Sequence, residues 1–197
     1  GEPGNQNFLT PEFWQPMVET VHGTIVECNT AYPGERNTTD AHRRTMIKHG
    51  WSKLFDVDIL DAEGPDLELP IPNGKRIQKN LVGKDIKNYD SMLVLSHFKG
   101  HPMGGFGGAL KQLSIGCASS AGKANIHGAG KPEEMWTTEQ NAFLESMADA
   151  AESVVKLFDG KIVYINVMKN MSVDCDCCAV AEDPCCLLYT SPSPRDS

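Results

Sequence analysis

Residues 97–127 gather three histidines and three lysines directly after an apolar run, and these residue types suit proton transfer or metal ligation. Imidazole titrates near about pH 6.5, so it can act as a general acid, a general base or a metal ligand. A lysine amine can stabilise developing negative charge or form a covalent bond. The residues that we expect to be catalytic are His97, Lys99, His101 and Lys111.

A glycine-rich stretch in the same segment is a candidate cofactor-binding loop, because it leads into a predicted helix at 109–115. Backbone N–H groups at the start of a helix can hold a phosphate or a carboxylate. The spacing lacks the Gly-Lys-Ser/Thr of a Walker loop, so a structural turn is the alternative. The candidate binding residues are Gly104, Gly105, Gly107, Gly108 and Lys111.

A second constellation is a cysteine-rich segment, in which residues 175–186 hold five of the seven cysteines. Close thiolates bind zinc, copper or an iron–sulfur cluster, since soft sulfur ligands select these metals. The spacing is that of neither a ferredoxin nor a zinc ribbon, so disulfides and a metal-free redox site are alternatives. The candidate metal ligands are Cys175, Cys177, Cys178 and Cys185. The isolated Cys28 and Cys117 are expected to be buried, although Cys28 at a strand end could join the site.

Hydrophobic periodicity predicts the elements that position these residues. Helices are expected at 11–22 after Thr10, at 41–49 after a cap at Thr39 or Asp40, and from a capping box of Thr137 with Gln140 to Gly160. Strands are expected at 24–28, 57–60, 91–96 and 161–168, with a hairpin at Asn73-Gly74. This alternation predicts an α/β fold with a mixed or mostly parallel sheet flanked by helices, in one domain over residues 1–186.

Three of these strands end in polar residues. The loops concerned begin at Glu27-Cys28-Asn29, at His97-Phe98-Lys99 and at Lys169-Asn170. In open α/β sheets, ligands bind outside the carboxyl ends of the strands. We therefore expect the three loops to converge on one site.

The two ends of the chain differ in composition from the rest. Residues 187–197 are rich in serine and proline and are similar to translated adapter sequence, so we interpret them as a foreign or disordered tail. The opening GEPGNQN has neither an initiating methionine nor a signal pattern. We expect a domain that is truncated at both ends.

Charge and hydropathy argue against two classes of partner. The formal net charge is −8 and only a modest basic stretch occurs, at 75–87, which argues against nucleic acid. The longest apolar runs, such as 92–95 and 162–168, are far shorter than the roughly 20 residues of a membrane span. We expect a cytoplasmic protein that meets a small molecule or a redox partner.

Several long runs resemble one known family. The runs GTIVECNTAY, LSHFKGHPMGGFGGALKQLSIGCAS and INVMKNMSVDCDCCAVAEDPC resemble the domain-of-unknown-function family number 362. Its members are described as uncharacterised iron–sulfur centre proteins. The resemblance implies an iron–sulfur cluster or another transition metal as the cofactor.

A more distant similarity concerns the core motif of the nickel-pincer lactate racemases. The matching pattern is H-x₂-G-x-F-x-G-x₂-K from His101 to Lys111, continued by Gly116, Ala118-Ser119 and His127. The resemblance implies that His101 is an acid or base, that Lys111 carries the pincer nucleotide and that His127 ligates nickel.

Three hypotheses follow. The first is a metal or iron–sulfur centre protein with redox or metal-assisted chemistry, in which the histidines and lysines of residues 97–127 face the cysteine segment. The second is a racemase-like or epimerase-like enzyme that acts on a small 2-hydroxy acid with a tethered nickel cofactor. The third is a metal carrier or electron-transfer module without chemistry of its own.

Overall fold

A computed structural model describes residue 4 and residues 7–172 of the chain. Its helices are α1 (Pro11–Val21), α2 (Thr39–Lys48), α3 (Trp51–Leu54), α4 (Ala109–Lys111), α5 (Ser120–His127) and α6 (Gln140–Phe158). Shorter turns are 3-10 helical at Lys84–Asn88 and Pro132–Glu134 and π-helical at Gln112–Gly116. The strands are β1 (Ile25–Glu27), β2 (Val57–Ile59), β3 (Leu67–Pro70), β4 (Lys79–Val82), β5 (Met92–His97), β6 (Lys99–His101), β7 (Gly105–Gly107) and β8 (Ile162–Val167).

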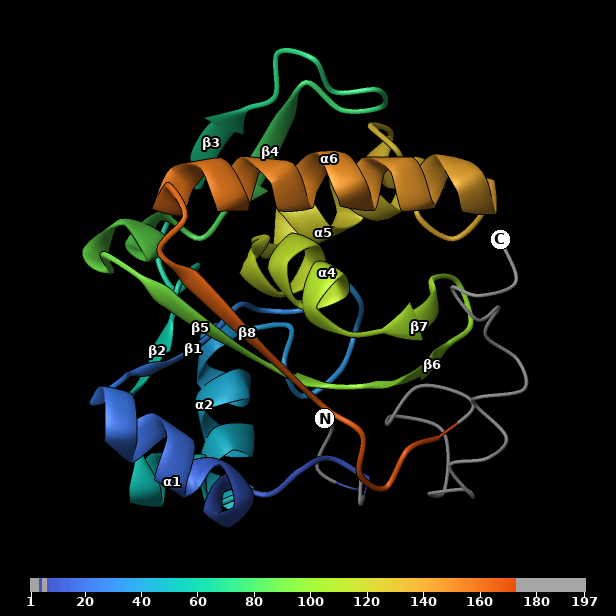
Figure 1. The fold of residues 1–197 in the computed structure, drawn as a ribbon. Helices are drawn as coiled ribbons and strands as arrows, with labels where there is room; N and C mark the ends of the chain where they lie inside the picture. The colour runs from blue at the N-terminus through green and yellow to red at the C-terminus, as the bar shows by residue number, and fades with distance from the viewer. Residues whose placement is uncertain (1–3, 5–6, 173–197) are drawn as a thin grey trace, which may run out of the picture.

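The strands of the described residues form two parallel and two antiparallel pairs. The parallel pairs are β1 with β2 and β5 with β8, and the antiparallel pairs are the hairpins β3–β4 and β6–β7. Helices flank these pairs, with α6 on one side of β5 and β8 in Figure 1 and α1 on the other. The expected α/β class with mixed strand directions is therefore confirmed.

Strand β5 has two apolar faces, because successive side chains of a strand point in opposite directions. Val94 packs with Val154 and Phe158 of α6 in one buried cluster. Leu95 instead packs with Trp14 and Val18 of α1 in another. Strand β5 is thus covered on both faces, whereas its partner β8 leaves Val163 62% and Tyr164 44% exposed.

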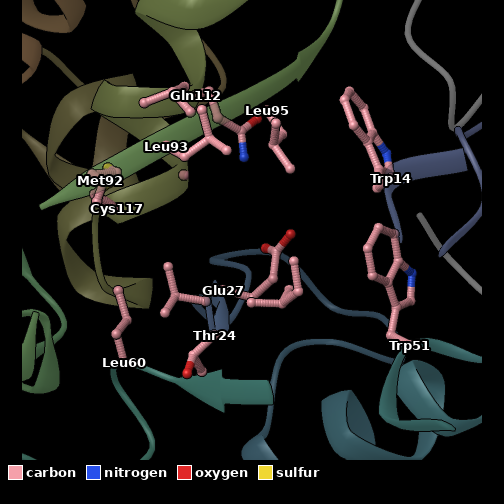
Figure 2. A pocket seen from close by; sticks show the side chains of 14 residues that line it. Trp14, Thr24, Glu27, Trp51, Leu60, Met92, Leu93, Leu95, Gln112 and Cys117 are labelled. Carbon is pink, nitrogen blue, oxygen red and sulfur yellow. The ribbon is translucent and has the colours of Figure 1, made fainter. Parts of the chain in front are cut away.

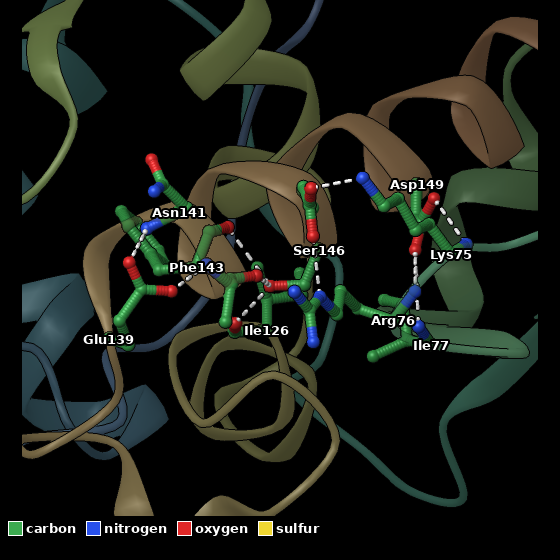
Figure 3. Close-up of polar contacts among 11 residues, drawn as sticks. Lys75, Arg76, Ile77, Ile126, Glu139, Asn141, Phe143, Ser146 and Asp149 are labelled. Carbon is green, nitrogen blue, oxygen red and sulfur yellow. Dashed lines mark hydrogen bonds and ion pairs between the residues drawn. The ribbon is translucent and has the colours of Figure 1, made fainter.

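Helix α6 also fixes the β3–β4 hairpin through charged side chains (Figure 3). The buried Asp149 carboxylate accepts backbone N–H groups from Lys75, Arg76 and Ile77 at 2.7–3.1 Å. One turn earlier, Glu145 pairs with the side chains of Lys75 and Arg76. These bonds satisfy the turn's N–H groups, which would otherwise lack partners beside a helix.

Most predicted elements lie within two residues of their expected bounds, but the sequence does not predict α3, α5, β6 and β7, and three caps differ from expectation. Thr10 stands before α1, but its side chain makes no capping hydrogen bond to the helix backbone. Helix α2 is capped by Thr38, whose hydroxyl accepts the Ala41 N–H, rather than by Thr39 or Asp40. At α6 the expected capping box is absent, because Glu139 accepts the N–H groups of Asn141 and Ala142 at 3.1 Å. Thr137 turns back to the Glu134 carbonyl. A carboxylate at this position satisfies two helix N–H groups and complements the helix dipole.

None of the helices described is long and apolar enough to cross a membrane.

Candidate functional site

Three elements bring candidate residues of the 97–127 segment together. The β6–β7 hairpin carries Lys99 and His101, with Lys99 opposite Gly107 and His101 opposite Gly105. Lys111 is the last residue of α4, and His127 is the last residue of α5. The charges of Lys99, Lys111 and His127 all act on the imidazole of His101. We call His101, Lys111 and His127, with Lys99, the histidine–lysine cluster.

His101 is held as a neutral imidazole. Its Nδ1 accepts the backbone N–H of Gly104 at 3.0 Å, so the proton of the neutral ring is on Nε2. Burial, the largest cause, and the neighbouring Lys111, His127 and Lys99 together lower the pKa of His101 to about 3. At neutral pH the ring therefore presents an N–H group that can donate.

His127 has the opposite tautomer. Its Nδ1 lies 2.7 Å from the backbone carbonyl of Lys123, and because a carbonyl only accepts, Nδ1 carries the proton. Burial lowers the pKa of His127, the charges of Lys111 and Lys123 act in the same direction, and the bond to the carbonyl opposes them. The ring stacks on Phe143, with centroids 4.9 Å apart. Nε2 thus keeps a lone pair, which suits a base or a metal ligand.

Lys111 sits where the helix geometry changes. The π-helical turn Gln112–Gly116 follows it directly and packs against α6. Such turns are rare and occur often at functional sites. The positive charge of Lys111 lowers the pKa of both His101 and His127.

His97 has a different position from the other candidates. It ends β5, and its Nε2 lies 2.6 Å from the carbonyl of Lys169, which follows β8. The paired ends of β5 and β8 therefore meet here, while the convergence of all three predicted loops on one site stays a prediction. Strand β1 pairs with β2 instead.

The glycines form the β6–β7 hairpin and its exit into α4. The N–H of Gly104 is used by His101, and Gly105 has a positive φ of 73° in the turn. A side chain at Gly108 would approach Asn166 Oδ1 to 3.2 Å. That oxygen accepts the Ala109 N–H at 3.0 Å, so the first amide of the helix is already satisfied by protein. The anion-binding role of these glycines stays a prediction.

A second polar cluster, which the sequence did not reveal, lies at the ends of β1 and β2. Asp61 accepts the backbone N–H of Asn29 and of Ser120, each at 2.9 Å. The Asn29 amide also donates to Thr39 and accepts from Nδ1 of the buried His42 at 3.2 Å. Burial lowers the pKa of His42. We call Asn29, Thr39, His42, Asp61 and Ser120 the Asp61 network.

Lys123 of α5 lies between the two clusters. It is only 8% exposed, and its amine donates to the Ala118 carbonyl at 2.6 Å. Its backbone carbonyl accepts from His127, and its charge acts on His42. The only local signal for this position is its place in the segment with the histidines, because a single lysine in a short helix resembles any surface residue.

The described cysteines are unsuited to metal binding as they stand. Cys28 and Cys117 are buried, and Cys28 Sγ donates to the Cys117 carbonyl at 3.4 Å. Burial raises the pKa of both thiols, that of Cys117 to about 12. Both are therefore protonated at neutral pH, whereas a metal ligand must be a thiolate.

The predicted cysteine ligands lie outside the described residues: Cys175, Cys177, Cys178 and Cys185. Among the described residues, three or more His, Cys, Asp or Glu side chains nowhere group closely enough to hold a metal ion. His127 is thus the one predicted metal ligand whose surroundings can be described, and the metal centre stays a prediction.

Comparison with known proteins gives one match. A family model described as Domain of unknown function (DUF362) matches residues 1–193. No curated protein and no solved structure matches the chain. Since the family model spans almost all of the 197 residues, the chain belongs to the DUF362 family.

Proposed function

We propose that the protein moves a proton on a small carboxylate-bearing substrate, with the help of a transition metal, at the histidine–lysine cluster. The observation that carries this proposal is the pair of opposite tautomers at His101 and His127. One imidazole offers Nε2–H and the other offers an Nε2 lone pair. A site with one donor and one acceptor at neutral pH supports acid–base chemistry.

The lysines supply the charge that such a substrate needs. Lys111 influences both imidazoles, and Lys99 influences His101. Two ammonium groups beside neutral imidazoles favour a carboxylate, and they stabilise the negative charge that develops when a neighbouring C–H bond loses its proton. Small 2-hydroxy acids combine a carboxylate with such a carbon.

The donor set fits a metal in part. Nε2 of His127 keeps its lone pair, and the opposite nitrogen is fixed by the Lys123 carbonyl, a common arrangement behind metal-bound histidine. A bound metal would act as a Lewis acid beside the substrate. The remaining ligands would come from the predicted cysteine segment, because Cys28 and Cys117 are protonated.

Two further functions compete with this proposal. The amine of Lys111, beside both imidazoles, also suits the covalent attachment of a tethered nickel-pincer cofactor. Intact-mass measurement of active protein tests that alternative, since an unmodified Lys111 in active protein contradicts it. A carrier or electron-transfer role needs metal but no proton transfer, so it predicts bound metal in a protein that exchanges no substrate hydrogen.

The experiment is hydrogen exchange on the substrate. Full-length chain purified without oxygen is analysed for Fe, Ni, Zn, Cu and acid-labile sulfide, and is then incubated in D₂O with D- or L-lactate and related 2-hydroxy acids. We expect deuterium at the α carbon by NMR, and loss of this exchange in His101→Gln.

The matched control is His22→Asn, which changes an exposed histidine at the end of α1. Exchange that persists in His101→Gln at the rate of the control would overturn the role of the cluster. Lys111→Gln should raise KM more than it lowers kcat if its main role is to hold the carboxylate.

A further inference from the structure

A cavity of about 130 Å³ lies between β1 and β5, with Trp14 of α1 and Trp51 of α3 on one side and Gln112 and Cys117 on the other. Figure 2 shows the carboxylate of Glu27 pointing into it, with Leu95 above and Trp14 and Trp51 at the side. The histidine–lysine cluster contributes none of the lining residues. The cavity is therefore separate from the site proposed above.

Glu27 occupies a position that strand periodicity makes apolar. Along β1, Val26 and Cys28 belong to the cluster under α6, whereas Ile25 packs into the cluster of α1. Glu27 shares the face of Ile25, because side chains two residues apart lie on the same side of a strand. An acidic residue thus stands where the neighbouring side chains are Trp14, Trp51 and Leu95.

The Glu27 carboxylate has no hydrogen bond or ion pair with the described residues, although its backbone carbonyl accepts the Leu60 N–H at 2.9 Å. This backbone bond holds β1 beside the chain that follows β2, so the Cα of Glu27 keeps its place on this face of the strand. A half-buried carboxylate beside apolar groups costs free energy unless a positive charge approaches it. The cavity is the open space next to this carboxylate.

The two tryptophans add aromatic surface to the cavity beside the carboxylate of Glu27. Trp14 is 4% exposed and packs edge-on against Phe13, and Trp51 packs against Phe55, so both indoles are held in place. Aromatic faces attract cations, tryptophan most strongly. The same aromatic cluster already makes such a contact, because the amine of Lys169 lies 5.0 Å from the centre of the Phe13 ring.

We propose that this cavity binds a small organic cation of the trimethylammonium type. Its volume corresponds to roughly four water-sized groups at about 30 Å³ each, which matches a nitrogen with three methyl groups. The methyl groups would contact the indoles and Leu95, and the charge would face Glu27. A hydrated metal ion fits less well, because Glu27 is the only carboxylate among the described residues that line the cavity.

The test is calorimetric titration of the full-length chain with choline, set against its neutral carbon isostere dimethylbutanol. We expect saturable 1:1 binding of choline with a change in tryptophan fluorescence, and at least about tenfold weaker binding of the isostere. Glu27→Gln should weaken choline binding by at least about tenfold. Glu19→Gln, an exposed change on α1, should leave it unchanged.

Trp51→Leu gives an independent test, because Trp51 is only partly buried and its replacement leaves the Trp14 core in place. It should weaken choline binding while Glu27 is intact. The proposal is overturned if choline shows no saturable binding, if the isostere binds equally well, or if Glu27→Gln binds choline like the unchanged chain. Sodium or potassium that competes equally with choline would also overturn it, since this would show a simple ion site.

Discussion

The Asp61 network and the histidine–lysine cluster contain similar residue types but differ in how their polar atoms are used. In the network both carboxylate oxygens of Asp61 accept N–H groups, and the amide of Asn29 uses both its ends. In the cluster, Nε2 of His101 and Nε2 of His127 make no hydrogen bond with the described residues. His42 Nε2 of the network also has no hydrogen bond with the described residues, but His42 is only 2% exposed, whereas His101 and His127 are half-buried and can meet a ligand. We therefore interpret the network as structural.

Helix α5 joins the two regions. Ser120, at its start, donates its N–H to Asp61, and His127, at its end, belongs to the cluster. Ser119 caps the helix by accepting the Gly122 N–H at 3.0 Å and is itself fixed by Asp66. The network therefore anchors one end of the helix and sets the position of the imidazole at the other.

The largest expected effect is on the network. Asp61→Ala removes two hydrogen bonds to a charged acceptor and leaves the backbone N–H groups of Asn29 and Ser120 without that acceptor. We therefore expect a loss of about 3 kcal/mol in the free energy of unfolding. Urea unfolding monitored by circular dichroism measures it. Asp90→Ala, at an exposed residue, is the control. A loss below about 1 kcal/mol would contradict the structural role of the network.

The next effect is the pH dependence that His101 gives to the stability of the protein. Below about pH 6.5 the unfolded chain protonates His101, whereas the folded chain does so only near pH 3. Stability from this group is therefore present above pH 6.5 and is lost as the pH falls from 6.5 toward 3.

From pH 7 to pH 4.5, the free energy of unfolding should fall by about 1 to 2 kcal/mol less in His101→Gln than in the unchanged chain. This figure is already reduced because the ring is partly exposed to solvent. Paired urea titrations at the two pH values measure this difference. His22→Asn, at an exposed residue, should lose as much as the unchanged chain. Equal losses in all three proteins would show that His101 is protonated in the folded state already at pH 4.5.

Local patterns explain what the sequence predicted well. The apolar runs of β5 and β8 and the helical spacing of Phe143, Met147 and Val154 in α6 arise from neighbouring residues, so they can be read directly. The sequence also predicts the grouping of His101, Lys111 and His127, because they lie within one short segment. Proximity in sequence and proximity in space coincide there.

The Asp61 network could not be predicted for the opposite reason. Asn29 and Asp61 are 32 residues apart, and Asp61 and Ser120 are 59 residues apart, so the pairing depends on how β1, β2 and α5 come together. The sequence predicts a polar end of β1, but Cys28 is buried and Glu27 belongs to the strand. No local pattern distinguishes an acidic strand residue that faces an apolar cavity from one that faces solvent.

A smaller effect tests the electrostatic link within the cluster. Lys111→Gln removes a positive charge near His101, so the pKa of His101 should rise. Because burial is the larger cause of the low value, the pKa should stay well below that of an exposed histidine. Titration by NMR measures it, with His22 as the internal reference. An unchanged pKa would show that the amine lies farther from the ring than the structure indicates.

The last prediction concerns which nitrogen of each imidazole carries the proton, and it tests the contrast between the cluster and the network directly. Nitrogen NMR of the imidazoles at pH 7 should show His101 protonated at Nε2, and His127 and His42 protonated at Nδ1. These assignments follow from partners that can only donate or only accept. The His42 signals should be insensitive to added 2-hydroxy acid or metal, since this residue is only 2% exposed, whereas those of the half-buried His101 and His127 should shift. If His101 and His127 share one tautomer, the cluster lacks its donor and acceptor pair, and the contrast with the network no longer explains where the chemistry lies.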